Sequence, residues 1–319
     1  MWLSDLHFSE EHHAFIKTET ENNSLFLRVN EALGKENVNL SAVIMSGDIT
    51  FKALEDEYKQ AEEFIKNLNS VYNLDSSNYA ITPGNHDLAF SDNPDKSDSK
   101  ITKTYPEAKK NFMGFYNRVF GCVPTEELFS IRRFLTPDLT PIEIICVNSC
   151  YLQQRKDSFQ GLGYVGSNQL EKIKQELKLT NHASPVRILV LHHHLMPVIY
   201  KEVPEYDRNY SLTLDSEAVV QFICEHNIKI VLHGHNHKEF YAEVIRKIKG
   251  NKKKFYIIGL GSSGVKDTEL SDGRQNMFAV ITAEKSCITI KGLSIMPTGE
   301  NHREVFEHKI SIIEEEGNV

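Results

Sequence analysis

Short apolar runs alternate with amphipathic stretches over most of the first 235 residues. Five of these runs are rich in β-branched residues and predict buried strands; they span 42–46, 79–82, 142–148, 186–191 and 228–232. Between them, apolar residues recur at helical spacing over 54–69, over 170–177 after the N-cap candidate Ser167, and over 219–223 after the N-cap candidates Asp215 and Ser216. This alternation of strands and helices indicates an α/β arrangement.

The last third of the chain has a different pattern. Its apolar runs are separated by turn-like segments rather than by helices; they span 240–246, 255–260, 277–283 and 287–293. Gly250-Asn251, in a lysine-rich stretch, marks the tip of a hairpin. An α/β part followed by antiparallel strands predicts an α/β (α+β) fold, a two-sheet mixed β-sandwich flanked by helices.

No linker or internal repeat divides the sequence, so we expect a single domain over 1–295. Residues 91–104 hold almost no apolar side chains and predict a mobile loop, for which gating of a site and plain filler are equally open. The rest of an insertion spanning 91–135 looks helical, with an aromatic face at 112–120 that we assign to the core. The polar segment 296–319 is expected to be a peripheral tail.

Composition and charge narrow the classes of function. The 319 residues include 36 Lys and Arg against 44 Asp and Glu, a net charge of −8, so nucleic acid is not an expected partner. No run approaches the roughly 18 apolar residues of a membrane span, and the N-terminus lacks the pattern of a signal peptide. Five scattered cysteines without a C-x-x-C pair favour a reducing, cytoplasmic location and argue against a disulfide framework and a thiolate metal cage.

Metal-capable side chains follow five of the apolar runs. They are Asp5 and His7, then Asp48, then Asn85, His86 and Asp87, then His192, His193 and His194, and finally His235 and His237. Ligands in open α/β sheets gather at the carboxyl ends of the strands, so we expect these clusters to meet in space.

The donor types suit two metal ions. Imidazole nitrogen with carboxylate and amide oxygen, and no sulfur, fits Mn, Fe or Zn. The donors are too many for one ion but fit two that share a carboxylate. Two ions about 3.5–4 Å apart can clamp an in-line displacement at phosphorus. Gly47, Gly84 and Gly234 would let the chain turn closely beside the ions.

The five blocks D-x-H, G-D, G-N-H-D, H and G-H-x-H occur in order over residues 5–237, and here the chain resembles the calcineurin-like metallophosphoesterases. The resemblance implies a helix-flanked two-sheet sandwich. It also implies that Asp5, His7 and His237 bind one metal, that Asn85, His192 and His235 bind the other, and that Asp48 bridges both. His86 would stabilise the transition state or protonate the leaving oxygen, and Asp87 would orient His86.

Three departures from that pattern stand out. Phe51 occupies the position where many relatives carry a second Asp, in the G-D-x-x-D form. The histidine run leaves the ligand ambiguous between His192 and His193, and we prefer His192 because it comes directly off the strand. Only Met-Trp-Leu-Ser precedes Asp5, so the first strand is unusually short; a clipped strand and a true start upstream of Met1 are both open.

Other candidates have ordinary interpretations. The pair His12 and His13 lies among glutamates and is expected to be solvated. His233 is expected to be a buried residue behind the ligands. The lysine cluster at 247–254 is expected to be a solvated hairpin rather than a nucleic-acid contact.

The leading hypothesis is a phosphoesterase that uses two divalent transition-metal ions, Mn²⁺ preferred over Fe or Zn. It would hydrolyse a small phosphodiester or phosphomonoester by in-line attack of a metal-bridging hydroxide. The run LHHHLMP (191–197) and the compact single domain look closest to the bacterial class III cyclic-nucleotide phosphodiesterases, so a nucleotide is one candidate substrate. A nuclease of the same superfamily and a catalytically weak scaffold are the alternatives. The natural substrate and the oligomeric state stay open.

Overall fold

The computed structural model describes residues 1–15, 24–89, 102–136, 138–151, 161–178, 185–197, 212–248, 250–270, 274–284, 286–296 and 302–312. Most of the loop expected at 91–104 lies outside the described residues, which resume at 102.

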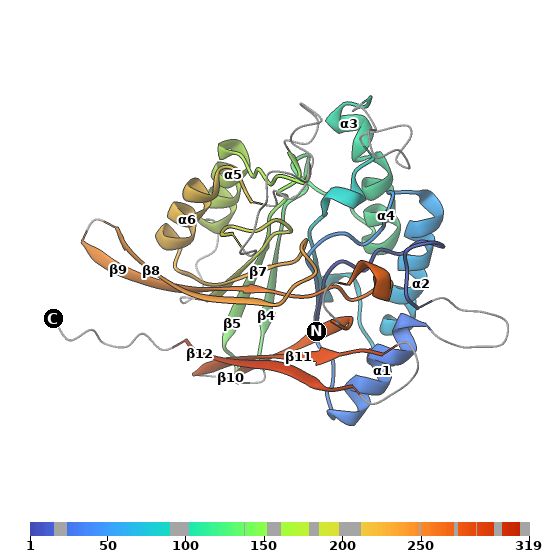
Figure 1. The fold of residues 1–319 in the computed structure, drawn as a ribbon. Helices are drawn as coiled ribbons and strands as arrows, with labels where there is room; N and C mark the ends of the chain where they lie inside the picture. The colour runs from blue at the N-terminus through green and yellow to red at the C-terminus, as the bar shows by residue number, and fades with distance from the viewer. Residues whose placement is uncertain are drawn as a thin grey trace.

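The described residues form two six-stranded sheets (Figure 1). The first has the order β12-β11-β10-β1-β2-β3 and the second β4-β5-β6-β7-β9-β8. In the first sheet β1, β2 and β3 are parallel, and in the second β5, β6, β7 and β9 are parallel. The strands are β1 Trp2–Leu3, β2 Val43–Met45, β3 Tyr79–Ile81, β4 Ser130–Leu135, β5 Pro141–Cys146, β6 Val186–Val190, β7 Ile228–His233, β8 Phe240–Ile248, β9 Asn251–Gly259, β10 Met277–Glu284, β11 Cys287–Ser294 and β12 Glu304–Ser311.

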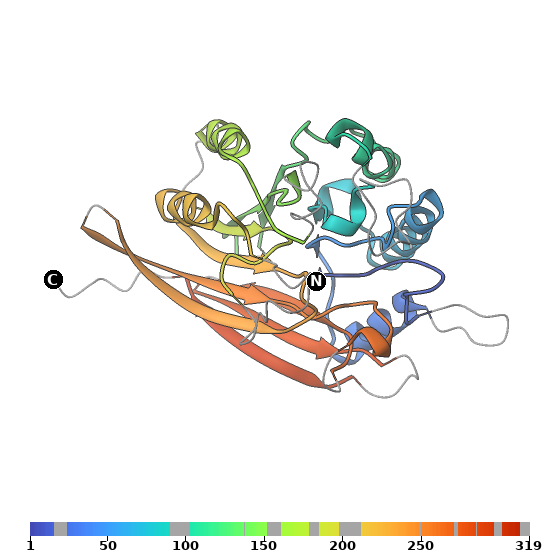
Figure 2. The ribbon, with the colours of Figure 1, turned by 45° about the horizontal axis from the view of Figure 1, so that its top comes forward.

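Helices cover the outer face of each sheet (Figure 2). They are α1 Leu25–Lys35, α2 Glu55–Tyr72, α3 Tyr105–Ala108, α4 Lys110–Phe120, α5 Ser167–Lys178 and α6 Ser216–Glu225, with short 3-10 turns at η1 Ser76–Asn78, η2 Asn85–Asp87 and η5 Asp267–Glu269. The helices α1, α2 and α4 pack on the first sheet, and α5 and α6 pack on the second. In Figure 1 these two groups stand on opposite sides of the strands.

The inner faces of the two sheets share a core of mostly aliphatic side chains. Trp2 and Ile44 from the first sheet meet Ile188, Ile230 and Ile258 from the second, and all five are at most 4% exposed. Strands that are buried on both faces read as near-continuous apolar runs, and this explains why β2, β5, β6 and β7 were visible in the sequence. The predicted two-sheet sandwich flanked by helices is confirmed.

The helix predicted at 54–69 is α2, and the reasons for its limits are local. Tyr58, Ala61 and Ile65 lie on its buried face, as the spacing predicted. The carboxylate of Glu57 accepts hydrogen bonds from the backbone N–H of Lys52 and of Leu54, which satisfies donors at the helix start. The helix ends at Asn73, whose φ of 53° is left-handed.

Two predictions about the chain outside the core are wrong in part. The insertion up to 135 is helical only to Phe120, because Ser130–Leu135 forms β4, antiparallel to β5. The Arg132 side chain of this strand donates hydrogen bonds to the Tyr79 carbonyl oxygen and to the Tyr116 hydroxyl. The polar segment after 296 is not wholly peripheral, since Glu304–Ser311 is the edge strand β12, with Ile310 fully buried.

The N-cap prediction at Ser167 is off by one position, since Ser167 is the first residue of α5. Among the described helices, none is both long enough and apolar enough to cross a membrane.

Candidate metal centre

The five predicted clusters meet at one end of the sandwich, where parallel strands of both sheets finish. Asp5 and His7 follow β1, Asp48 follows β2, and Asn85 follows β3. His192 follows β6 of the second sheet, and its Nδ1 lies 2.9 Å from the carbonyl oxygen of Ser46 in the first. The convergence expected from the strand-end rule is thus what the structure shows.

The loops that carry these side chains have unusual backbone geometry. Five of the predicted ligands have left-handed φ angles although none is glycine: Asp5 (50°), His7 (46°), Asp48 (50°), His235 (78°) and His237 (52°). Such conformations cost on the order of 1–3 kcal/mol each and cluster at functional sites. The surrounding packing therefore holds these residues in place against a local preference.

Two of the glycines are required by close approach. A Cβ on Gly84 would overlap the carboxylate and the backbone N of Asp48. A Cβ on Gly234 would overlap the side chains of Ser4 and Asp5. Glycine at these positions lets the loops after β3 and β7 lie directly against the acidic residues.

The first group of donors is Asp5, His7 and His237. The Nε2 atoms of His7 and His237 are 3.2 Å apart. Asp5 Oδ1 lies 3.5 Å from His237 Nε2 and 4.0 Å from His7 Nε2. Asp5 and His7 are buried, while His237 is partly open to solvent.

The second group is Asp48, His192 and His235, and Asn85 stands beside it. The Nε2 atom of His192 is 3.1 Å from three atoms: Asp48 Oδ2, Asn85 Oδ1 and His235 Nδ1. Since His192 Nδ1 donates to the Ser46 carbonyl oxygen, Nε2 of the neutral ring carries a lone pair toward these acceptors. A cation between them would relieve this crowding of lone pairs.

Asp48 joins the two groups. Its Oδ2 lies 3.7 Å from His7 Nε2 on one side and 3.1 Å from His192 Nε2 on the other. Its Oδ1 accepts a hydrogen bond from the backbone N–H of His86 at 2.8 Å, so Oδ1 is held by the backbone and Oδ2 faces the two donor groups. This is the position that a bridging carboxylate requires.

Further contacts orient the donors. The backbone N–H of His235 donates to the Asp5 carboxylate at 3.0 Å. The Nε2 of His235 lies 3.2 Å from the carbonyl oxygen of Gly161, so Nε2 is the protonated atom of the neutral ring and Nδ1 faces the centre. Outer contacts of this kind fix the tautomer and the ring plane of metal-binding histidines.

The electrostatics of the cluster fit a bound cation. Burial disfavours the charged ring of His192, but the carboxylates of Asp48 and Asp5 outweigh this and raise its pKa to about 9. Burial disfavours the charged form of Asp48 too, and the neighbouring histidines nevertheless hold its pKa well below the usual range. Positive charge between these carboxylates is therefore favoured, whether a proton or a metal supplies it.

His86 lies next to both groups, but its partner is not the one expected. Its Nδ1 donates to the carbonyl oxygen of Phe51 at 2.6 Å. The carboxylate of Asp87 instead accepts from the backbone N–H groups of Ile49, Thr50 and Gly84 at 2.9–3.1 Å. The prediction that Asp87 orients His86 is wrong in this respect, because the buried Asp87 carboxylate is used to tie the loops after β2 and β3 together.

The histidine run after β6 separates into different environments. His192 faces the donors, whereas Nδ1 of His193 lies 2.8 Å from the hydroxyl of Ser149. His194 packs against His233 with ring centroids 4.2 Å apart. His233 and the three histidines of the run are all fully buried, and His233 lies behind the donors as predicted.

A cavity of about 290 Å³ opens onto both groups. It is lined by His7, His12, Asp48, Phe51, His86, His235, His237 and Val265. The expectation of a solvated pair at 12 and 13 is wrong, because His12 stacks on Phe51 at 3.8 Å and His13 is only 3% exposed. His12 and Phe51 were missed as site residues; only their place in the chain, a few residues after His7 and Asp48, could have pointed to them.

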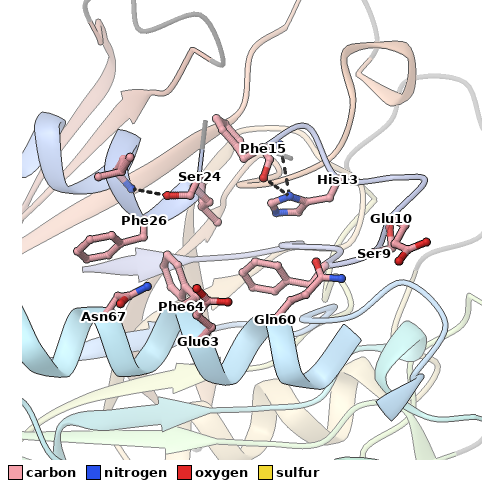
Figure 3. Close-up of a pocket in the computed structure, with 13 residues that line it drawn as sticks. Ser9, Glu10, His13, Phe15, Ser24, Phe26, Gln60, Glu63, Phe64 and Asn67 are labelled. Carbon is pink, nitrogen blue, oxygen red and sulfur yellow. Dashed lines mark hydrogen bonds between the residues drawn. The ribbon is translucent and has the colours of Figure 1, made fainter. Parts of the chain in front are cut away.

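A larger cavity of about 640 Å³ is also lined in part by residues of the segment after β1. Figure 3 shows Gln60, Glu63, Phe64 and Asn67 of α2 on one side of it and Phe15 and Ser24 on the other. None of the predicted ligands lines this cavity.

Comparison with solved structures finds Vps29 proteins at low similarity. Vps29 in complex with Zn²⁺ from Entamoeba histolytica is similar at 10% identity and a TM-score of 0.38, with 97% of each chain covered. Vacuolar protein sorting 29 from Cryptosporidium parvum shows 11% identity and a TM-score of 0.38, with 97% of this chain and 96% of that one covered. Scores this low carry no weight for fold or function. No curated protein matches the sequence.

The profile of the family described as calcineurin-like phosphoesterase matches residues 1–239, that is 239 of the 319 residues. This range contains every donor of the two groups and His86. The chain belongs to the calcineurin-like phosphoesterase family.

Proposed function

We propose that this protein is a phosphoesterase that depends on two divalent metal ions. Asp5, His7 and His237 would hold one ion, Asn85, His192 and His235 the other, and Asp48 both. The observation that carries the proposal is the position of Asp48 Oδ2 between the His7 and His192 nitrogens.

The spacing of the donors fits metal coordination. Ligands at adjacent positions around one ion, each about 2.1 Å from it, lie roughly 3 Å from each other. Four of the distances between donor atoms are 3.1–3.2 Å. A single proton on His192 Nε2 points to one of the three atoms that lie 3.1 Å from it, whereas a metal ion between the donors can be bound by all of them. We take Mn²⁺ as the preferred ion, and Fe or Zn suit the same nitrogen and oxygen donors.

When bound, two such ions polarise the phosphoryl oxygens and lower the pKa of water near the phosphorus. The chain supplies the remaining chemistry. His86 lines the cavity beside the donors, and its Nδ1 proton is given to the Phe51 carbonyl oxygen. Nε2 is therefore the atom that takes up the second proton when the ring is an imidazolium, and from there it can donate a hydrogen bond to a phosphoryl oxygen or pass that proton to the leaving oxygen. Asp87 supports this arrangement by holding the Thr50 backbone.

The size of the cavity and the net charge of the chain support the proposed substrate class. About 290 Å³ accommodates a phosphoryl group with a small leaving group. We propose a small phosphodiester or phosphomonoester, with a nucleotide such as a cyclic nucleotide among the candidates. The net charge of −8 argues against a long nucleic acid. A cytoplasmic setting is part of the proposal and is supported by five free cysteines, three of them buried.

The test is a substrate panel assayed with Mn²⁺, Fe²⁺ and Zn²⁺ after removal of metal by a chelator. The panel contains bis-p-nitrophenyl phosphate, p-nitrophenyl phosphate, cyclic AMP and single-stranded DNA. Hydrolysis of at least one small ester that stops with chelator and returns with metal is the expected result. Binding of two metals without hydrolysis of any ester would point to a scaffold, and preference for DNA would point to a nuclease.

A further inference from the structure

Three aromatic rings form a stack along one wall of the smaller cavity. The ring of His12 lies on Phe51 with centroids 3.8 Å apart and planes 25° apart. The ring of Phe51 is in turn nearly parallel to His86, at 5.2 Å and 18°. His12 comes from the loop after β1, Phe51 from the loop after β2 and His86 from η2, so the stack exists only in the folded protein.

Phe51 also contacts His86 through its backbone. Its carbonyl oxygen accepts the Nδ1 proton of His86 at 2.6 Å. The edge of the His7 ring closes a further side of His86, at 5.0 Å and 74°. Phe51 thus contacts the His86 ring in two ways: its carbonyl oxygen accepts a hydrogen bond in the plane of the ring, and its phenyl ring packs on the face of the ring.

The loop that carries Phe51 is anchored on both sides. Before it, the N–H and hydroxyl of Thr50 donate to the Asp87 carboxylate at 2.9 and 3.0 Å. After it, Ala53 has a left-handed φ of 55°, and its carbonyl oxygen accepts from the Asn111 side chain at 2.9 Å. The Phe51 carbonyl is therefore a fixed acceptor, and His12 covers the outer face of the phenyl ring.

We propose that Phe51 and His12 are positioning residues for His86, and that they keep its Nε2 directed into the cavity during phosphoester hydrolysis. This rests on the function proposed above. The terminal torsion of a histidine side chain has a broad minimum, so an unrestrained ring samples many orientations. The carbonyl selects the tautomer, and the stack restricts the rotation of the ring. His12 contributes through its flat surface and needs no imidazole chemistry of its own.

Paired substitutions at each position separate stacking from other roles. His12→Ala removes the outer ring, whereas His12→Phe keeps an aromatic surface without nitrogen atoms. Phe51→Leu removes the inner ring but keeps the backbone carbonyl, and Phe51→Tyr keeps both. His308→Ala is the matched control, because His308 also stacks on an aromatic ring, Tyr241, at 4.1 Å and 22°, on strands away from the cavity.

We expect kcat to fall about tenfold in His12→Ala and Phe51→Leu, less than the roughly 10²-fold that a 1 Å misplacement can cost, because the carbonyl contact to His86 remains. In both variants KM should stay within about threefold and the content of two metals should be unchanged, since no proposed ligand is altered. His12→Phe, Phe51→Tyr and His308→Ala should stay within about twofold of the parent kcat. If His12→Phe is as slow as His12→Ala, the imidazole itself is needed and the proposal is wrong. If His12→Ala keeps the parent kcat, the stack does not position His86.

A second readout does not depend on activity. In ¹⁵N-labelled protein, two-bond ¹H–¹⁵N spectra should show the neutral His86 ring protonated on Nδ1. The His86 ring signals should broaden or shift in His12→Ala and recover in His12→Phe. Unchanged His86 signals in His12→Ala would overturn the positioning role. A parent protein that hydrolyses no ester but shows these shifts would instead refute the proposed function and leave the positioning role standing.

Discussion

The segment that follows β1 contributes residues to two cavities, and these cavities differ in volume and in the side chains that line them. His7 lines the smaller one, of about 290 Å³, and its neighbour Phe8 lines the larger one, of about 640 Å³. The smaller cavity is walled by histidines and Asp48. The larger one has Phe15, Phe64 and the polar edge of α2. The consecutive residues His7 and Phe8 thus line different cavities.

The difference shows that the candidate metal centre is marked by backbone geometry and by the convergence of donors, and not by the volume of the cavity. Asp48, His7, His235 and His237 line the smaller cavity and have left-handed φ angles. None of the thirteen described residues that line the larger cavity has one. We conclude that packing holds strained backbone conformations in place at the smaller cavity, whereas at the larger cavity it buries side chains without such strain. Substitutions should therefore affect activity at the smaller cavity and stability at the larger one.

The largest effect is expected for Asp48→Asn. A neutral amide between two dications holds them poorly, so turnover should fall by about 10³-fold or more, because metal assistance is worth several kcal/mol. Metal content should fall below two ions per chain, as measured by elemental analysis beside kcat. The control is Asp215→Asn, because Asp215 accepts backbone hydrogen bonds from Val165 and Gly166 and stands outside the donor groups. A fully active Asp48→Asn protein would remove the basis of the proposed site.

His86→Ala should rank next. Loss of a group that donates a hydrogen bond or a proton in the transition state costs about 10²–10⁴-fold in rate. Both metals should remain bound, since His86 belongs to neither donor group. If His86 protonates the leaving oxygen, the loss should be smaller for a p-nitrophenyl ester than for an alkyl ester. Equal losses would indicate charge stabilisation, and loss of the metals would show that His86 is misassigned.

Much of the fold and of the donor set could be predicted because each signal is local. A buried parallel strand is a short apolar run, and the residue that follows it is by position at the sheet edge. His192 and Asp48 were found in this way, although 144 positions separate them (192 − 48 = 144). The strands β4 and β12 were missed because they carry charged side chains, which give no clear apolar run. Arg132 in β4 and Glu307 in β12 are examples.

The contacts around His86 could not be read from the sequence for a different reason. Every residue has a carbonyl oxygen, so nothing in the chain marks that of Phe51 as the acceptor for Nδ1. The stack of His12 on Phe51 depends on how the loops after β1 and β2 meet in the fold. Asp87 was expected to orient His86, but its carboxylate instead accepts from the backbone N–H groups of Ile49 and Thr50 in another loop, which no motif specifies.

Phe64→Ala tests the other side of the comparison. Phe64 is 4% exposed, lines the larger cavity and packs near Phe8 at 5.8 Å. Truncating it should lower the free energy of unfolding by about 3 kcal/mol, the low end for such a change because the side chain already borders open space. The kcat should stay within about twofold. Glu63→Ala, at an exposed position of the same cavity, should change stability by less than about 0.5 kcal/mol. A large loss of kcat in Phe64→Ala at full folding would show that the two cavities are coupled.

The smallest effect concerns pH and the buried His13 of the larger cavity. Burial lowers the pKa of His13 from 6.5 to about 4, and the Phe15 backbone opposes this only in part. Below pH 6.5 the unfolded chain takes up a proton at this position that the folded chain does not. The contribution of His13 to stability is therefore fully present above pH 6.5 and is lost as the pH falls toward 4. The loss amounts to at most about 3 kcal/mol, and to about 2–3 kcal/mol at pH 4.5. His13→Gln, which cannot titrate, should lose less stability than the parent between pH 7 and 4.5 by that amount, as measured by urea unfolding at each pH. The kcat at pH 7 should be the same in both proteins. Parallel curves of stability against pH for the two proteins would mean that His13 is not held neutral by burial.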